Sequence, residues 1–271
     1  MSAAGDSTDA RRALLSRLID HAALFPPASL PMGAALEVDA KARATPEAWM
    51  LNRFLVPASQ LGAVPEDFEP PLGVIVDTDE LPELSGRRVV TVEGRLERAD
   101  VIRAERWRAP SARQVSTPRV FLEVWPGNGA KLREVADRGA GAKVRCGGPT
   151  PDMFPSPAEL AAFITGCREL GLPFKATAGL HHPIRDGIVH GFLNLLAAAV
   201  LAHAGGGERE LIAVLLEEEA SAFGVTEEAF TAGGHRFGVE QVVAARAELF
   251  VGYGSCSFSE PVEDLRALGF L

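Results

Sequence analysis

Lysine is scarce in this sequence, although arginine is abundant. Only four of the 27 basic residues are lysines, namely Lys41, Lys131, Lys143 and Lys175. Lys175 lies in the segment FKATAGLHHP (174–183), which predicts the end of an apolar strand followed by two histidines. Because the chain uses arginine for nearly every other positive charge, a lysine inside an apolar strand indicates a specific role.

Positive charge is in deficit, and long apolar runs are missing. The 36 acidic residues exceed the 27 basic ones, which gives a net charge of −9. Such a chain would repel a phosphate backbone, so no nucleic-acid partner is expected. The longest apolar run (192–202) is shorter than the roughly 20 residues that cross a bilayer, and residues 1–15 lack the apolar core of a signal peptide. We therefore expect a soluble, cytoplasmic protein with no membrane partner.

Cysteine is also rare, and one common nucleotide-binding motif is missing. Cys146, Cys167 and Cys256 are widely spaced and form no CxxC motif. This spacing excludes a zinc knuckle or a disulfide scaffold and suits a reducing compartment. No GxGxxG motif follows an early strand, which disfavours a dinucleotide-binding sheet.

Short β-branched segments alternate with helical patterns along the chain. The seven predicted strands are 52–59, 72–78, 88–94, 119–125, 141–148, 173–180 and 248–255. Helix-compatible stretches lie between them, at 97–107, 129–138 and 157–170, and Ser156 and Glu159 form a capping-box pattern at the start of the last one. This alternation predicts an α/β protein with a (β/α)8, TIM-like barrel, and a doubly wound parallel sheet is the competing architecture.

The chain predicts one domain, residues 1–271, with no linker composition inside it. Residues 1–50 are expected to form an N-terminal helical extension, and residues 51–271 the barrel. The missing eighth strand is expected within 206–224, a segment compatible with either strand or helix. The Pro-rich stretch 24–31 is expected near the mouth of the barrel, either as a lid or as a packed connection.

Charged side chains share one parity class on the predicted strands. Side chains alternate in direction along a strand, so residues of one parity face the barrel interior together. That class contains Asp77, Thr91, Glu93, Glu123, Lys143, Arg145, Lys175 and Thr177. Buried charges are costly unless they are paired or used, so the set predicts an active site at the carboxyl ends of the strands. A purely structural reading, in which Glu123 pairs with Lys143 or Arg145 to hold neighbouring strands, stays open.

Small residues and histidines follow the charged strands. Glycines at these strand ends would let backbone N–H groups approach a ligand, as would the Gly/Ser-rich turn after the last strand. Adjacent residues of an extended segment point in opposite directions, so one of His181 and His182 at most is expected to face the site. The residues expected to bind substrate are Arg145, Gly147, Gly148, Thr177, Gly179, Ser255, Ser257, Asp77 and Glu93.

The segments KVRCGG and KATAGL, on two predicted neighbouring strands, resemble the lysine-bearing strand ends of Schiff-base (class I) aldolase barrels, in particular the deoxyribose-phosphate aldolase group. The resemblance covers about fifteen residues, and it implies that Lys175 is the imine-forming lysine and Lys143 the second lysine, which lowers the pKa of its neighbour. The chain differs from that family in the order of the two lysine strands and in the double histidine.

Elementary chemistry favours the same hypothesis. A lysine attacks a carbonyl at neutral pH only when loss of solvent or a nearby cation lowers its pKa, and Lys143 with Arg145 would supply that cation for Lys175. The groups expected to move protons are Glu123, Asp77 and one of His181 and His182. The sequence thus predicts a lyase of aldolase type that acts on a small anionic carbonyl metabolite without a cofactor.

Two other functions stay open. The first is a metal-dependent lyase or isomerase, in which His181 or His182 and the carboxylates Glu123, Glu93 or Asp77 would hold Mg²⁺, Mn²⁺ or Zn²⁺. In that case the lysines would hold an enolate or a carboxylate. The second is a barrel that binds an anionic metabolite without catalysis, through Lys143, Arg145, Lys175 and the Gly/Ser turn. The substrate and a homo-oligomeric state are also left open by the sequence.

Overall fold

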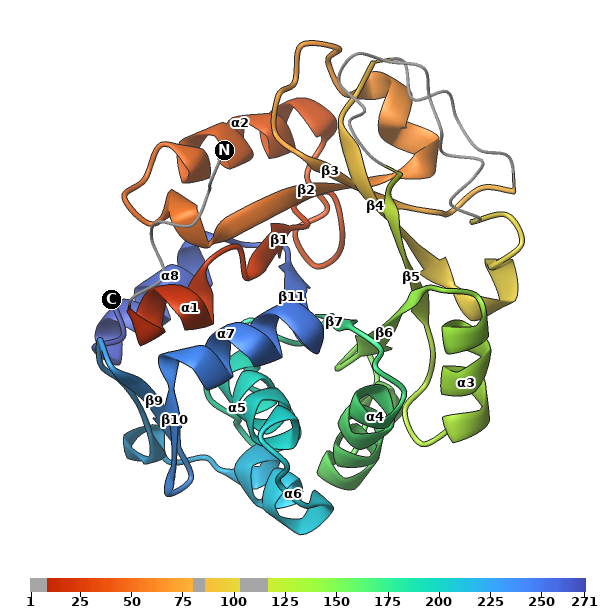
Figure 1. Cartoon of the computed structure of the whole chain (residues 1–271). Coiled ribbons are helices and arrows are strands. Elements are labelled where there is room, and N and C mark those ends of the chain that lie inside the picture. The colour runs from red at the N-terminus through yellow and green to blue at the C-terminus, as the bar shows by residue number, and fades with distance from the viewer. Residues whose placement is uncertain (1–8, 80–85, 103–116) are drawn as a thin grey trace, which may run out of the picture.

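Eight parallel strands close into a barrel (Figure 1). The computed structural model describes residues 9–79, 86–102 and 117–271. The barrel strands are β1 (Ile19–His21), β2 (Leu51–Pro57), β3 (Leu72–Ile75), β4 (Val89–Arg95), β5 (Arg119–Glu123), β6 (Gly141–Arg145), β7 (Phe174–Thr177) and β11 (Phe250–Ser255). The expected TIM-like (β/α)8 architecture is therefore confirmed.

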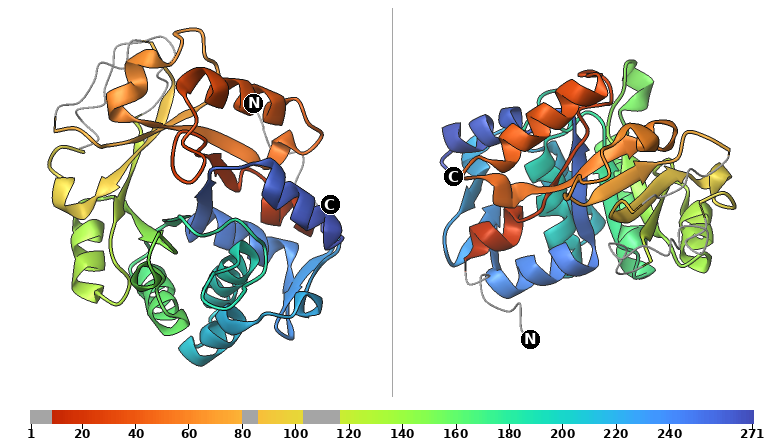
Figure 2. Two further views of the ribbon diagram at one scale, coloured as in Figure 1. Left: turned by 180° about the vertical axis from the view of Figure 1, so that it is seen from behind. Right: turned by 90° about the horizontal axis from the view of Figure 1, so that it is seen from above.

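Helices surround the barrel and form its outer layer (Figures 1 and 2). The α-helices are α1 (Ala10–Leu15), α2 (Met32–Arg43), α3 (Gly129–Asp137), α4 (Pro157–Glu169), α5 (Phe192–His203), α6 (Glu208–Leu216), α7 (Val239–Glu248) and α8 (Ser259–Ala267). Short 3₁₀ turns occupy Ala48–Met50, Ala58–Ala63, Leu96–Arg98, Pro151–Met153 and Ala220–Ala222. The capping box before α4 is formed as predicted, because Glu159 N donates to Ser156 Oγ at 3.2 Å and Ser156 N donates to Glu159 Oε2 at 2.7 Å. The helix expected at 97–107 lies partly outside the described residues.

The N-terminal segment contains the first barrel strand, which corrects the division at residue 51. β1 pairs with β11 on one side and with β2 on the other, so the barrel would not close without it. The segment 206–224 contains α6, a 3₁₀ turn and the start of β8 (Phe223–Val225). β8 pairs with β9 (Ala229–Ala232) and β9 with β10 (His235–Gly238) in a separate antiparallel sheet, so the expected eighth barrel strand is not in that segment.

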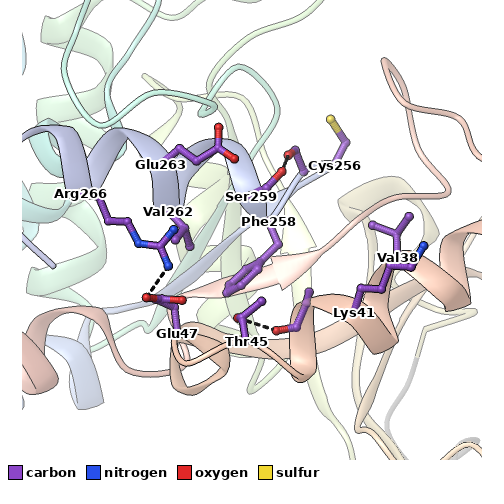
Figure 3. A pocket seen from close by; sticks show the side chains of 12 residues that line it. Val38, Lys41, Thr45, Glu47, Cys256, Phe258, Ser259, Val262, Glu263 and Arg266 are labelled. Carbon is purple, nitrogen blue, oxygen red and sulfur yellow. Dashed lines mark hydrogen bonds and ion pairs between the residues drawn. The ribbon is translucent and has the colours of Figure 1, made fainter.

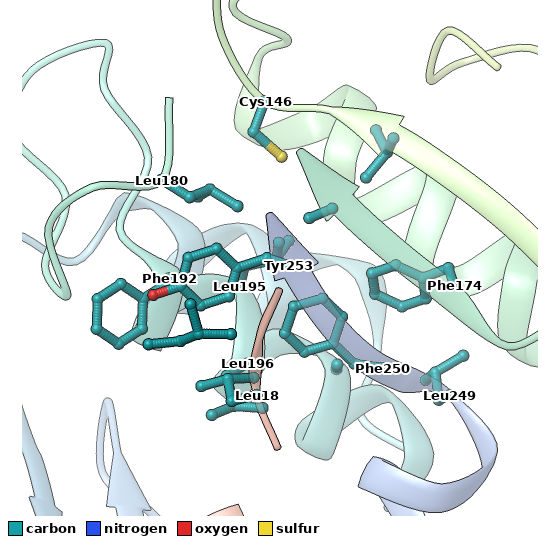
Figure 4. Close-up of a cluster of buried hydrophobic side chains, with 14 of the residues drawn as sticks. Leu18, Cys146, Phe174, Leu180, Phe192, Leu195, Leu196, Leu249, Phe250 and Tyr253 are labelled. Carbon is teal, nitrogen blue, oxygen red and sulfur yellow. The ribbon is translucent and has the colours of Figure 1, made fainter. Parts of the chain in front are cut away.

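The main apolar core lies between the barrel and its helices (Figure 4). α5 is apolar on all sides because it packs on the barrel strand β11 and also against α4, α6 and α7. Its Phe192 stacks on Tyr253 of β11 with ring centroids 5.2 Å apart. This burial on every side explains the long apolar run at 192–202. None of the described helices has the length and apolarity needed to cross a membrane.

Glycines make room for large side chains inside the barrel. A Cβ atom at Gly141 would lie 2.6 Å from the Phe121 ring and 2.8 Å from the carbonyl oxygen of Pro173. Phe121 is fully buried and lies under the charged cluster described below, with the Lys175 Nζ 5.6 Å from its ring centroid. The glycine on β6 thus lets an aromatic ring fill the barrel beneath Lys175.

Gly141→Ala should destabilise the protein by about 1–3 kcal/mol, because the added methyl overpacks the interior against backbone as well as side chain. Gly129→Ala is the matched control, since Gly129 starts α3 and a Cβ there meets nothing within 4 Å. Chemical denaturation of both variants would measure the two changes. An equal loss in both would contradict the steric explanation.

Candidate active site

A row of charged residues crosses three neighbouring strands inside the barrel. Lys143 of β6 is in register with Lys175 of β7, and Glu123 of β5 is in register with Lys143. Registered residues of parallel strands project to the same side of the sheet. The parity argument therefore correctly placed these three charges together.

Lys175 is the most deeply buried cation of this row, with 1% of its side chain exposed. Its Nζ forms ion pairs with Asp20 Oδ2 at 2.5 Å and with Glu93 Oε1. A buried ammonium is tolerated when it is paired and hydrogen-bonded, and here two carboxylates on different strands meet this requirement. Lys175 is thus not a solvated surface charge.

Asp20 and Arg53 belong to the site, and the sequence analysis did not select them. Asp20 projects inward from β1, and Arg53 of β2 donates through Nη1 to Asp20 Oδ2 at 2.9 Å. Asp20 is fully buried. The signal in the sequence is an acidic residue within the apolar stretch LIDHAAL, which lies in the segment predicted as a helical extension.

Glu93 of β4 joins the two lysines. Its Oε1 contacts Lys175, and its Oε2 lies 3.1 Å from Lys143 Nζ. Burial alone raises the pKa of Glu93, but the attraction of Lys175 and Lys143, with a smaller effect of Arg53, lowers that pKa to about 2. Glu93 is therefore ionised at neutral pH and holds both ammonium groups.

The cluster becomes more exposed toward the carboxyl ends of the strands. Glu123 Oε2 lies 3.8 Å from Lys143 Nζ, and Glu123 Oε1 lies 3.5 Å from Arg145 Nε. The exposed fraction of the side chain is 7% for Lys143, 19% for Glu123 and 38% for Arg145. The exposed fraction of the charged side chains thus rises from Lys175 toward Arg145. Lys143 and Arg145, the cations expected to lower the pKa of Lys175, are both paired with carboxylates.

The two histidines contact α8, one turn apart. His181 Nδ1 lies 3.1 Å from Glu260 Oε2, and His182 Nδ1 lies 2.7 Å from Asp264 Oδ2. Both rings thus reach the same helix, although adjacent residues of an extended strand would diverge. Within the described part of the chain, neither imidazole forms an ion pair with Asp77, Glu93 or Glu123.

Asp77 lies at the rim of the mouth, where it accepts hydrogen bonds from Ser59 N at 2.9 Å and from Ser59 Oγ at 2.5 Å. Asp77 is exposed, and its hydrogen-bond partner Ser59 lies in the 3₁₀ turn that follows β2. Thr177 faces the interior, because its Oγ1 would lie 3.6 Å from a Cβ at Gly254 of β11. Of this pair, only Thr177 is directed toward the interior of the barrel.

The glycines expected to cradle a ligand contact protein atoms. A Cβ at Gly147 would lie 2.9 Å from the Cα of Gly179, and one at Gly148 would lie 2.3 Å from Met153 Sδ. Gly179 also has a φ of +70°, which favours glycine. These residues let the loops after β6 and β7 touch, and His190 Nε2 to Pro155 O at 2.6 Å joins the same two loops. The two loops therefore lie against each other at the carboxyl ends of β6 and β7.

Ser255, the last residue of β11, and Ser257 form hydrogen bonds within the turn that leads to α8. Ser255 Oγ donates to Ser257 O at 2.6 Å, and Ser257 Oγ accepts from Glu260 N at 3.2 Å at the start of α8. Their hydroxyl groups therefore stabilise the turn and the helix start. Arg145 is a partly exposed cation at the mouth.

The described ranges contain no group of three or more His, Cys, Asp or Glu side chains placed to hold a metal ion. Comparison of the chain with protein families, with curated proteins and with solved structures finds no match.

Glu93→Gln should lower the free energy of unfolding at pH 7 by about 3–5 kcal/mol, because it removes the charge that two buried ammonium groups share. Glu97→Gln is the matched control, since Glu97 is exposed and pairs with Lys131 at 3.2 Å on the surface. The control should change stability by less than about 1 kcal/mol. Denaturant titration of both variants measures the difference, and similar values would argue against a buried network.

Acid should destabilise the wild-type protein through Glu93. The pKa of Glu93 is lower in the folded state, at about 2, than its ordinary value of 4.5, so its stabilising contribution is present above pH 4.5 and is lost as the pH falls toward 2. Glu93→Gln should therefore lose less stability than the wild type between these pH values. Parallel pH dependences of the two unfolding free energies would contradict this assignment.

Proposed function

We propose that the protein is a lyase of aldolase type, in which Lys175 forms a Schiff base with a small anionic carbonyl compound. One observation carries the proposal: the Nζ of a buried lysine is held between two carboxylates, Asp20 and Glu93, at the inner end of a charged cluster whose outer members, Glu123 and Arg145, are partly exposed.

Imine formation needs the neutral amine, so Lys175 must first lose a proton. Asp20 Oδ2 and Glu93 Oε1 both contact its Nζ and are placed to accept that proton. The amine nitrogen then bonds to the carbonyl carbon, and the carbinolamine loses water to give the iminium. The carboxylate that accepted the proton can return it to the departing hydroxyl group, so no external acid is required.

Cleavage uses the iminium as an electron sink. Glu123 removes the proton of a β-hydroxyl group, the bond between the α and β carbons breaks, and the electron pair passes to the iminium nitrogen to give an enamine. Glu123 then transfers that proton to the α carbon, and water hydrolyses the new iminium to free Lys175. Glu123 suits this role because it lies between Lys143 and Arg145, nearer the mouth than Lys175.

The charge of the cluster favours an anionic substrate. Asp20, Glu93 and Glu123 contribute three negative charges, whereas four cations contact them: Arg53, Lys143, Arg145 and Lys175. One positive charge is left over, and Arg145 is the most exposed of these cations. A planar guanidinium binds a carboxylate or phosphate group through paired hydrogen bonds. Phe121 fills the barrel below Lys175, so the substrate must be small enough to fit above it.

Borohydride reduction in the presence of acetaldehyde, acetone or pyruvate should attach the carbonyl compound to Lys175. The added mass is that of the carbonyl compound minus one oxygen atom, and peptide mapping is simple because the chain has only four lysines. Lys175→Arg keeps the positive charge but cannot form an imine, so it should abolish the adduct. Lys41→Arg, a change at an exposed lysine paired with Glu37, should leave the adduct unchanged.

The mapped position decides between the functions. Adducts spread equally over all four lysines, or retained in Lys175→Arg, would refute the Schiff base. If no carbonyl compound is trapped and turnover appears only when a divalent metal is added, the metal-dependent lyase or isomerase becomes the better explanation.

Glu123→Gln separates catalysis from simple binding. The iminium of acetone or pyruvate exchanges its methyl protons with deuterium oxide when a base removes them, and NMR follows this exchange. We expect Glu123→Gln to slow exchange by about 10²–10⁴-fold while borohydride trapping at Lys175 persists. Glu97→Gln, on the surface, serves as the control. Unchanged exchange in Glu123→Gln would remove Glu123 from the mechanism, and an absence of exchange in the wild type would favour a binding protein.

A further inference from the structure

A cysteine and a histidine meet outside the ion-pair cluster. Cys256 follows β11 directly, and His181 lies in the loop after β7, the strand that neighbours β11. The Cys256 Sγ lies 3.9 Å from His181 Nδ1, within the range of a sulfur hydrogen bond. The same Nδ1 also faces Glu260 Oε2 at 3.1 Å. The thiol is thus next to an imidazole that a carboxylate orients.

His181 is protonated over the neutral range. Its pKa is raised from 6.5 to about 9. The hydrogen bond to Cys256 is the largest cause, Glu260 raises the pKa further, and burial acts in the opposite direction. An imidazolium beside a thiol stabilises the thiolate, which is the reactive form of cysteine. The pair therefore has the composition of an activated thiol.

Cys146 and Cys167 have a different environment. Both are fully buried. Burial raises the pKa of Cys167 well above its usual value. Burial also raises the pKa of Cys146 to about 12, although the charge of Arg145 opposes this change. Cys256 is half-buried. The protein thus has one accessible thiol beside an imidazole and two inert ones, which serve as internal controls.

Cys256 lies at the rim of a groove of about 400 Å³ between α2 and α8 (Figure 3). In Figure 3 its sulfur is turned away from Phe258, toward the outside of the groove. The ionisable groups lining the groove are Lys41 of α2, Glu47, and Glu263 and Arg266 of α8, and Arg266 is paired with Glu47. Small reagents can therefore approach the sulfur from the rim without entering the barrel.

We propose that Cys256 and His181 form a thiolate–imidazolium pair that is a site of oxidation by peroxides. In the reaction with hydrogen peroxide, the Cys256 sulfur bonds to one oxygen and the O–O bond breaks. The departing hydroxide takes the proton of the His181 imidazolium and leaves as water, and the cysteine becomes a sulfenic acid. The site is independent of Lys175 and of the lyase reaction.

The test is treatment of the folded protein with hydrogen peroxide and dimedone, followed by mapping of the three cysteines by mass spectrometry. We expect the dimedone adduct at Cys256, with Cys146 and Cys167 unlabelled. In a parallel measurement at pH 7, His181→Gln should slow alkylation of Cys256 by iodoacetamide at least about tenfold. His182→Gln is the matched control, because His182 bonds to Asp264, and its rate should stay within about twofold of the wild type.

Two further measurements distinguish the imidazole from a change in local structure. The ratio of wild-type to His181→Gln alkylation rates should shrink toward one between pH 7 and about pH 10, because an ordinary thiol ionises near pH 8.5 and His181 loses its proton near pH 9. Glu260→Gln leaves the imidazole in place and should stay within about threefold of the wild-type rate at pH 7. A ratio that does not vary with pH, equal slowing by Glu260→Gln and His181→Gln, or labelling of a buried cysteine first would overturn the proposal.

Discussion

The interior of this barrel depends on the ion pairs that the Glu93 carboxylate forms with Lys143 and Lys175. Two ammonium groups, on β6 and β7, share its two oxygens, and β4, which carries Glu93, lies two strands from β6 and three from β7 in the barrel. Moving an unpaired ammonium from water into a protein interior costs several kcal/mol, and Glu93 shares this compensation with Asp20 at Lys175 and with Glu123 at Lys143. The position of Glu93 therefore fixes where both lysines end, and Asp20 with Arg53 completes the enclosure of Lys175.

This charge cluster is possible because the barrel interior is not the main apolar core. The large apolar side chains of α5 and β11 pack outside the barrel wall, where Phe192 stacks on Tyr253. Inside, Phe121 seals the floor beneath Lys175 and leaves the space above it to polar groups. Apolar burial outside the wall thus supplies the stability that lets the interior hold charges, which add little net stability themselves.

Strand periodicity explains which parts of this arrangement could be predicted from sequence. The period of two along each strand predicts that Glu93, Glu123, Lys143 and Lys175 lie on one face of the sheet. Closure of the barrel turns that face inward and brings the four side chains together. β1 has only three residues, too few for a periodic pattern, so Asp20 was not recognised as an inward charge. The histidines lie in a loop, where no period applies, and their partners on α8 are 79 and 82 residues away in sequence. Contacts of that kind depend on the folded connection between β11 and α8.

The ion pairs that stabilise Lys175 also oppose its proposed reaction. An amine held as ammonium by Asp20 and Glu93 cannot attack a carbonyl until a proton moves onto one of them, so the resting protein is protected against nonspecific adducts. A bound anion near Arg145 would weaken the pairing of Arg145 with Glu123 and free that carboxylate to act on the substrate. Reactivity would then depend on occupancy of the mouth. A cluster that is fully paired when empty is a physical basis for selectivity toward substrates that carry both a carbonyl group and an anion.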